Sequence, residues 1–288
     1  MQLSRREWFG IAAGACAAGA ASAAEKKVKI SGIRFGVTDW NMQLAGKVEA
    51  LAFAKSLGFQ GIEVSVGQKP VDGKLPLDDA ALQRQYLDAK KRTRMEISCA
   101  YLDILHTAPL KSEKQAAKWV SDGIRIARNL GARGVLMPMM GNGMPNGPKE
   151  LDAVGDILVD LGRETEKAKV VLTLESRMPA ADYIRIIERS KSSAVMVMFD
   201  VMNTPQQGAD AAQELAKLGK KHVVQMHMKD RGGAGYLGDG KVDFQGVRKV
   251  IADIGYKGWI DLETANPSKS VENDMKKNLA FLKALLAS

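Results

Sequence analysis

Hydrophobic residues along this chain alternate between two kinds of spacing. Eight short runs are rich in apolar and β-branched residues, as strands are. Each is followed by a longer stretch in which apolar residues recur every three or four positions, as at Ile124, Ala127 and Leu130, which is typical of an amphipathic helix. This pattern predicts strands at 33–40, 61–66, 96–102, 134–140, 170–176, 195–201, 223–230 and 258–264. It predicts helices at 47–58, 78–93, 113–131, 149–169, 179–192, 208–221, 243–255 and 270–287.

Strict alternation of strands and helices, without hairpins, favours parallel strands joined by right-handed crossovers. Gly58, Gly131 and Gly255 stand where three of the helices are expected to end, and glycine there supplies a left-handed cap. Eight such units fit a (β/α)8 TIM barrel, formed as one domain by residues 30–288. A doubly wound open sheet is the alternative, but the count of eight and the lack of a nucleotide-binding fingerprint after the first strand weigh against it.

Four consecutive predicted strands end on an ionisable residue: Glu175, Asp200, His227 and Glu263. The intervals between them are 25, 27 and 36 residues, each about one strand–helix unit. Barrel enzymes carry their chemistry at the carboxyl ends of the strands, so these side chains are expected to converge on one side of the barrel mouth.

Three carboxylates and one imidazole suit a divalent cation with oxygen and nitrogen ligands, such as Mn²⁺, Mg²⁺, Co²⁺ or Fe²⁺. Without a cation, carboxylates so close together repel one another and some take up protons. Each residue alone would more often be a helix cap, an ion-pair partner or, for His227, a core residue. Their common register on adjacent strands favours a metal site.

Three more polar residues are candidates for substrate contact. Glu63 shares a strand face with Ser65 and is expected to point into the mouth, His106 lies in the loop after the third strand, and Lys229 should face inward two residues past His227. Each is equally compatible with a structural role in its loop.

Residues 233–238 fit G-x-G-x-x-G, but no helix follows at once, so a dinucleotide site is not expected. Asp243, a little further on, is a candidate helix N-cap.

The first residues predict an export signal rather than part of the fold. Arg5 and Arg6 precede a short alanine-rich apolar run, too short for a membrane span, and an Ala-Ser-Ala that suits signal peptidase. The pattern resembles a twin-arginine signal over residues 1–23, with cleavage after Ala23 and a periplasmic location. Lipid anchoring at Cys16 is not expected, because the usual large aliphatic residue before it is missing.

Composition narrows the class of protein further. The formal charge is +9, yet the basic residues are spread over helix faces without basic blocks, which disfavours a nucleic-acid partner. Removal of the signal leaves Cys99 as the one cysteine, so no internal disulfide can form. Cys99 lies in an apolar run and is expected to be a small buried residue.

The strand ends resemble the xylose-isomerase-like barrels, specifically the sugar phosphate isomerase/epimerase family of the D-tagatose 3-epimerase type. The resemblance covers nearly the whole mature chain and rests on the order and spacing of several short motifs. They are "LGFQGIEV", "TLES" with Glu175, "MFDVMN" with Asp200, "HMKD" with His227 and Asp230, "LGDGKVDF", and "IDLET" with Glu263.

The resemblance implies that Glu175, Asp200, His227 and Glu263 hold one divalent ion, most typically Mn²⁺. It implies that this ion binds a carbonyl and a neighbouring hydroxyl of a sugar and stabilises an enediolate. It also implies that Glu175 and Glu263 act as the acid/base pair. The chain departs from the family where Asn203 replaces a substrate-binding histidine, which puts the specific epimerase reaction in doubt. Asp230 and Arg231 are the remaining candidates for substrate contact.

Three functions stay open at this point. The leading one is a metal-dependent sugar isomerase or epimerase with a small-molecule substrate, no nucleic-acid partner and no stable membrane insertion; a homo-oligomer is left open. The second is a dehydratase or lyase of the inosose dehydratase type, and the third is a secreted sugar-binding barrel without turnover. An endonuclease IV type nuclease needs more histidines than the three present here.

Overall fold

The eight apolar runs form the eight strands of a closed barrel in the computed structural model, which describes residues 30–203, 208–231 and 234–287. The strands pair in chain order, β1 to β8 and back to β1, and every pairing is parallel. They are β1 (Arg34–Thr38), β2 (Gly61–Ser65), β3 (Glu96–Tyr101), β4 (Gly134–Met139), β5 (Val171–Ser176), β6 (Val195–Asp200), β7 (Val223–Met228) and β8 (Trp259–Leu262). This closure confirms the predicted TIM barrel and rules out the open sheet.

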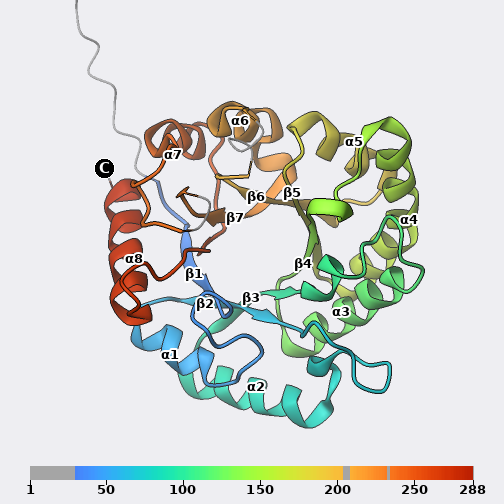
Figure 1. Ribbon diagram of the computed structural model, residues 1–288, viewed down its shortest axis with the longest axis horizontal. Helices are drawn as coiled ribbons and strands as arrows, with labels where there is room; N and C mark the ends of the chain where they lie inside the picture. The colour runs from blue at the N-terminus through green and yellow to red at the C-terminus, as the bar shows by residue number, and fades with distance from the viewer. Residues whose placement is uncertain (1–29, 204–207, 232–233, 288) are drawn as a thin grey trace, which may run out of the picture.

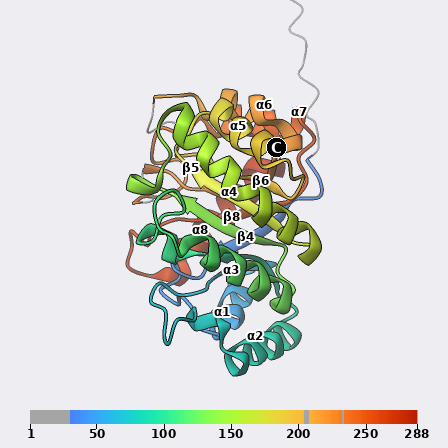
Figure 2. The same cartoon turned by 90° about the vertical axis from the view of Figure 1, so that its right-hand side faces the viewer.

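In the described part of the chain, eight α-helices surround the barrel (Figure 1). They are α1 (Ala50–Ser56), α2 (Ala80–Thr93), α3 (Ala116–Leu130), α4 (Gly147–Ala168), α5 (Ala180–Ser190), α6 (Ala211–His222), α7 (Phe244–Asp253) and α8 (Val271–Ala287). Figure 2 shows α3, α4 and α5 side by side on the outside of the barrel. Short 3-10 turns add η1 (Pro76–Asp78), η2 (Asp103–His106) and η3 (Gly141–Gly143).

The helices bury the faces that their periodicity predicts. Ile124, Ala127 and Leu130 of α3 are all buried against the barrel. Gly131 caps α3 in the left-handed region, at φ 61°, and the Asp243 carboxylate accepts the N–H of Gly246 at 2.9 Å to cap the start of α7. Local sequence signals therefore end and begin these helices where they were expected.

The predicted export signal over residues 1–23 lies outside the described residues, whereas the predicted buried cysteine, Cys99, lies within them. Cys99 is fully buried, and burial raises the pKa of its thiol well above the usual value, as suits a small core residue. Among the described helices, none is long and apolar enough to cross a membrane.

One buried carboxylate ties β1 to β2 at the barrel mouth. Asp39 follows β1, and its Oδ2 accepts the backbone N–H groups of Gly46 and Ser65, both at 2.9 Å, while its Oδ1 accepts the Ser65 hydroxyl at 2.8 Å. Burial raises the pKa of Asp39 to about 7 in spite of these hydrogen bonds. The carboxyl group therefore takes up a proton in the folded protein at a higher pH than in the unfolded chain.

This raised pKa predicts a pH-dependent stability difference between the wild type and Asp39→Asn. The contribution of Asp39 is fully present below about pH 4 and is lost as the pH rises through about 7, because the folded state holds the proton more tightly. The uncharged asparagine can keep an oxygen toward the two N–H groups and has no such dependence. We expect the variant to gain up to roughly 4 kcal/mol relative to the wild type between about pH 4 and pH 8. Urea unfolding at both pH values measures this, and a constant difference would contradict the assignment.

Candidate metal centre

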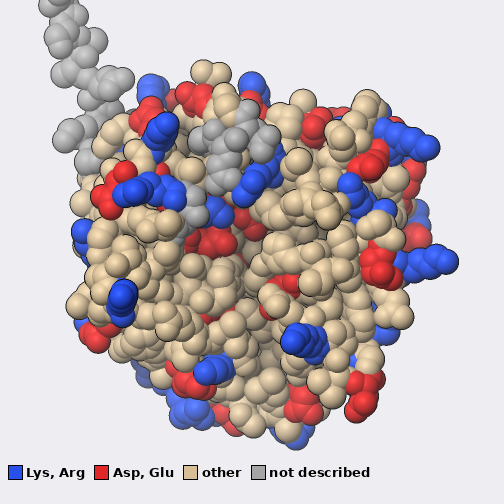
Figure 3. Space-filling view, viewed as in Figure 1, with Lys and Arg blue, Asp and Glu red and all other residues tan. Residues whose placement is uncertain are grey.

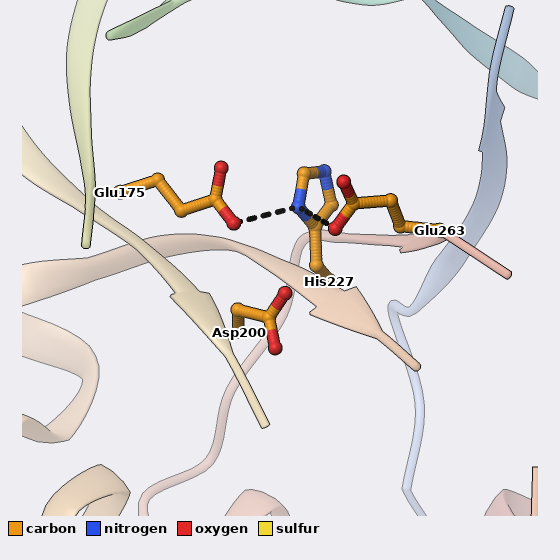
Figure 4. Close-up of side chains that lie close together, drawn as sticks. All are labelled: Glu175, Asp200, His227 and Glu263. Carbon is orange, nitrogen blue, oxygen red and sulfur yellow. Dashed lines mark hydrogen bonds and ion pairs between the residues drawn. The ribbon is translucent and has the colours of Figure 1, made fainter. Parts of the chain in front are cut away.

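Glu175, Asp200, His227 and Glu263 converge at the carboxyl-terminal mouth of the barrel. Each offers one ligand atom, and these atoms all lie within 4.8 Å of one another. Figure 4 shows Glu175 and Glu263 on opposite sides of His227, with Asp200 below them. The structure thus brings together all four strand-end residues that the sequence singled out.

The barrel register places these side chains. Asp200, the last residue of β6, pairs with His227 of β7, and Glu263 directly follows β8 and donates its backbone N–H to the carbonyl of Met228 at 3.2 Å. In the parallel strands every second residue points into the barrel, so β8 contributes Asp261 and then Glu263 at successive depths. Figure 3 shows the result as a hollow at the centre of this face, with acidic surface inside it and basic surface beside it.

His227 is fully buried and contacts carboxylates on both ring nitrogens. Its Nδ1 lies 3.2 Å from Glu263 Oε2 and 3.5 Å from Glu175 Oε1, and its Nε2 lies 3.1 Å from Glu63 Oε1. Burial works against the charged imidazolium, but the three carboxylates outweigh it and raise the pKa of His227 well above its usual value. The ring is therefore held between three acceptors, with Nδ1 on the side of the two glutamates.

Lys229 brings a positive charge directly into the cluster. Its Nζ lies 2.6 Å from Asp200 Oδ2 and 2.7 Å from Glu263 Oε2. Burial opposes the charge on Lys229, but these two carboxylates raise its pKa well above the usual value. The ammonium group thus sits between two of the four candidate metal ligands, facing inward as the sequence predicted.

The pKa values of Asp200 and Glu263 are displaced in opposite directions in this environment. Burial raises the pKa of Asp200 to about 7, although Lys229 works against the rise. Burial also disfavours the charged form of Glu263, but Lys229 and His227 outweigh it and hold the pKa of Glu263 below its usual range. Crowded carboxylates with displaced pKa values are typical of a functional site.

The donor set fits a divalent ion. Three carboxylates and one imidazole whose ligand atoms lie within 4.8 Å of one another match the oxygen and nitrogen ligands that Mn²⁺, Mg²⁺, Co²⁺ and Fe²⁺ take. The described cysteine, Cys99, is not among the four residues of this group. Metal binding at His227 requires a deprotonated nitrogen, so an ion and a proton compete for Nδ1.

The sequence predicts that Glu63 points into the barrel mouth, but Glu63 lies deeper in the barrel. It is fully buried behind His227, where its Oε1 contacts His227 Nε2 and accepts a hydrogen bond from Gln225 at 2.7 Å. Gln225 also donates to Asp261 at 2.8 Å, and Ser98 donates to Asp261 at 3.1 Å. These residues form a buried polar layer beneath the four strand-end residues, and Glu63 is placed to hold the imidazole rather than to contact a substrate.

Glu63 gives the imidazole a defined orientation. An acceptor at Nε2 keeps the proton there and leaves Nδ1 turned toward Glu175 and Glu263, and such outer partners support metal affinity. We expect Glu63→Leu to weaken Mn²⁺ binding by roughly 10- to 100-fold. Glu63→Gln keeps an acceptor oxygen and should bind within a few-fold of the wild type. Calorimetric titration of both variants, with circular dichroism as a folding check, measures this, and equal affinity in Glu63→Leu would contradict the role.

Two residues that the sequence analysis singled out, Asn203 and His106, lie around the cluster together with two aromatic residues. Asn203 is buried, and its Nδ2 donates to Glu175 Oε1 at 3.1 Å, so it contacts a candidate metal ligand. His106 lies at the mouth with its Nε2 2.6 Å from the Tyr101 hydroxyl. Trp40 and Tyr101 were not singled out from the sequence; their ring centroids lie 4.3 Å apart, and Trp40 meets His227 edge-on at 6.3 Å. Both rings are half-buried, Trp40 in the turn after β1 and Tyr101 at the end of β3, and no local sequence signal separates such rings from core residues.

Asp230 takes a different place from the substrate contact expected of it. It is fully buried, and its carboxylate accepts backbone N–H groups of Arg231, Gly238, Gly240 and Lys241 at 2.9–3.1 Å. These hydrogen bonds hold the loop between β7 and α7 in place. Arg231 beside it is exposed. Asp230 therefore shapes the loop, because its carboxylate accepts hydrogen bonds from several backbone N–H groups of the described part of that loop.

Comparison with known proteins places the chain in a family. The model of the xylose isomerase-like TIM barrel matches residues 51–285, so the chain belongs to that family, as its motifs suggested. A search of curated proteins found no match.

Several solved structures share the fold. An L-ribulose 3-epimerase is 18% identical with a TM-score of 0.71, over 88% of this chain and 94% of the other. A 3-keto-D-glucoside 4-epimerase from E. coli is 17% identical with a TM-score of 0.71, over 88% and 99%. A D-psicose 3-epimerase solved in the presence of D-fructose is 12% identical with a TM-score of 0.74, over 88% and 100%. At these identities the likeness establishes the barrel itself.

Proposed function

We propose that this protein is a divalent-metal-dependent sugar isomerase or epimerase that transfers a proton at a carbon next to a carbonyl group. One observation carries the proposal: Glu175 and Glu263 stand on opposite sides of His227, within one cluster of potential ligands (Figure 4). The family and the epimerase names of its structural neighbours support it.

Glu175, Asp200, His227 and Glu263 would hold one divalent ion, of which Mn²⁺ is the first candidate and Mg²⁺, Co²⁺ and Fe²⁺ are alternatives. When bound, it would supply a Lewis acid that draws electron density from neighbouring carbonyl and hydroxyl oxygens of the sugar. The buried layer of Glu63, Gln225 and Asp261 holds His227 from behind. This layer thus supports the candidate ligands from below, on the side away from the mouth.

The two glutamates would move the proton. One removes it from the carbon beside the carbonyl, which leaves an enediolate, and the other returns a proton on the same or the opposite face. Their positions on either side of His227 give access to both faces of a substrate placed between them. Epimerisation requires both faces, and isomerisation requires only one.

Neighbouring residues would orient the sugar. The amide of Asn203 is a donor beside Glu175, and the Lys229 ammonium lies beside Asp200 and Glu263. Trp40 and Tyr101 form an aromatic wall next to His227, a surface on which the apolar face of a sugar can rest, with His106 bonded to Tyr101 at its edge. The Asn203 amide donates a hydrogen bond but neither takes up nor releases a proton at neutral pH, so proton transfer falls to the glutamates.

Solvent exchange tests the proposal and separates the alternatives. Metal-loaded protein is incubated with free and phosphorylated ketoses in D₂O and followed by NMR, with EDTA-treated protein as the control. Deuterium entering beside the carbonyl, dependent on the metal, is the expected result. Loss of water without return of the proton would identify a dehydratase, and no exchange across the panel would leave a sugar-binding barrel.

We also propose that the chain is exported through residues 1–23, by way of Arg5 and Arg6. The paired arginines and the short apolar run after them support this. Replacing both arginines by lysine keeps the charge and should retain the protein in the cytoplasm. Equal amounts in the periplasmic fraction for both forms would refute the signal.

A further inference from the structure

A second pocket opens at the opposite end of the barrel from the metal centre. It has a volume of about 370 Å³ and is lined by the first residues of β1, β4, β5 and β8, namely Arg34, Gly134, Val171 and Trp259. The buried side chains of Thr173 and Gln225 also line it, so the pocket reaches into the barrel interior from below. It shares no residue with the four candidate metal ligands.

Among the described residues, five cationic side chains line this pocket and no Asp or Glu does. They come from separate segments of the barrel's lower end: Arg34, Arg128, Arg133, Lys169 and Lys257. Arg34 pairs with Glu96 at 2.9 Å and lies over the Trp259 ring, with 4.1 Å from its guanidinium carbon to the ring centroid. Within the described part of the chain, no ion pair involves the other four. Like charges gathered around one concave surface create a positive potential that attracts anions.

Trp259, which lines the pocket, carries a donor without a partner. Its side chain is 3% exposed, and its Nε1 is buried without a hydrogen-bond partner among the described residues. A buried indole N–H normally has a partner, and leaving it unpaired is costly.

From these two observations we propose that the lower pocket binds a small polyanion with two or more phosphate or carboxylate groups. Cations on separate segments suit separate charged groups, which a monovalent anion does not offer. Arg34, placed over the Trp259 ring, would be one of these cations. The site is independent of the proposed sugar chemistry at the other end of the barrel.

Calorimetric titration with pyrophosphate and with tricarballylate tests the site on the metal-loaded protein, with acetate as the monovalent comparison. Binding of pyrophosphate, of tricarballylate or of both, with acetate much weaker, is expected, and the two probes show which group is preferred. Tryptophan fluorescence should change on binding, and Trp259→Phe should lose that change.

Matched double variants locate the binding. Arg133→Ala/Lys169→Ala should weaken the preferred anion at least about tenfold, since charge-assisted contacts are lost. Arg163→Ala/Lys276→Ala removes the same charge from exposed helix positions and should bind like the wild type. No binding of either probe at millimolar concentration, or the same weakening in both double variants, would overturn the proposal.

Discussion

We expect Glu175→Gln and Glu263→Gln each to lower the rate of deuterium exchange into the sugar by roughly 10²- to 10⁴-fold. Glutamine keeps the shape of the side chain and one ligand oxygen, but it cannot accept a proton from carbon. The loss should therefore appear mainly in kcat. Initial rates of deuterium incorporation on the best substrate of the ketose panel measure it.

The control for this pair is Glu272→Gln, which makes the same change on an exposed turn of α8 where Glu272 pairs with Lys276. It should leave the exchange rate unchanged. If Glu175→Gln and Glu263→Gln both retain metal and exchange within about threefold of the wild type, the glutamates are not the acid/base pair.

Lys229→Met strengthens Mn²⁺ binding by at least about tenfold, because the Lys229 ammonium and a divalent ion compete for the same carboxylate oxygens. Its Nζ lies 2.6 Å from Asp200 and 2.7 Å from Glu263, both candidate ligands. The metal-free variant should also unfold at a lower temperature, since three carboxylates then face one another without that counter-charge. Calorimetric titration and thermal unfolding measure the two effects.

Lys276→Met serves as the matched control, since it removes an exposed lysine of α8 that pairs with Glu272 rather than with a residue of the cluster. Lys276→Met should leave the Mn²⁺ affinity and the unfolding temperature of the metal-free protein close to the wild-type values. Weaker Mn²⁺ binding in Lys229→Met would contradict competition and show instead that the lysine supports the metal centre.

The barrel and the four-residue cluster were predictable because both depend on repeated local signals. Period-two and period-3.6 patterns define the strands and helices, and the parallel topology then brings the ends of consecutive strands together. Glu175, Asp200, His227 and Glu263 could be read from their position at the last residues of apolar runs. The N-cap at Asp243 and the left-handed cap at Gly131 are equally local, and both are found.

The depth of Glu63 could not be predicted in the same way. It pairs with Thr38 near the end of β1, but on the other side it pairs with Cys99, which in turn pairs with Gly134 at the start of β4. This stagger between strands is a property of the closed barrel and is not visible in any one strand. Glu63 is therefore the middle residue of β2 in sequence and is buried behind His227 in space.

Asp230 and the aromatic wall show a second limit. Three of the backbone N–H groups that Asp230 accepts, those of Gly238, Gly240 and Lys241, lie eight to eleven residues further on, in a loop whose path no local pattern specifies. Trp40 and Tyr101 belong to different strand–helix units and meet only through tertiary structure. Side-chain partners that depend on the course of loops need the three-dimensional structure.

Titration of metal-free protein with Mn²⁺ tests the central claim most directly. We predict one ion bound per chain in the wild type and in His106→Ala, and none bound at the same concentrations in His227→Ala. Both variants remove a histidine from the same end of the barrel, but only His227 belongs to the cluster. Absence of binding in the wild type, or one ion still bound by folded His227→Ala, would contradict the metal centre and the function built on it.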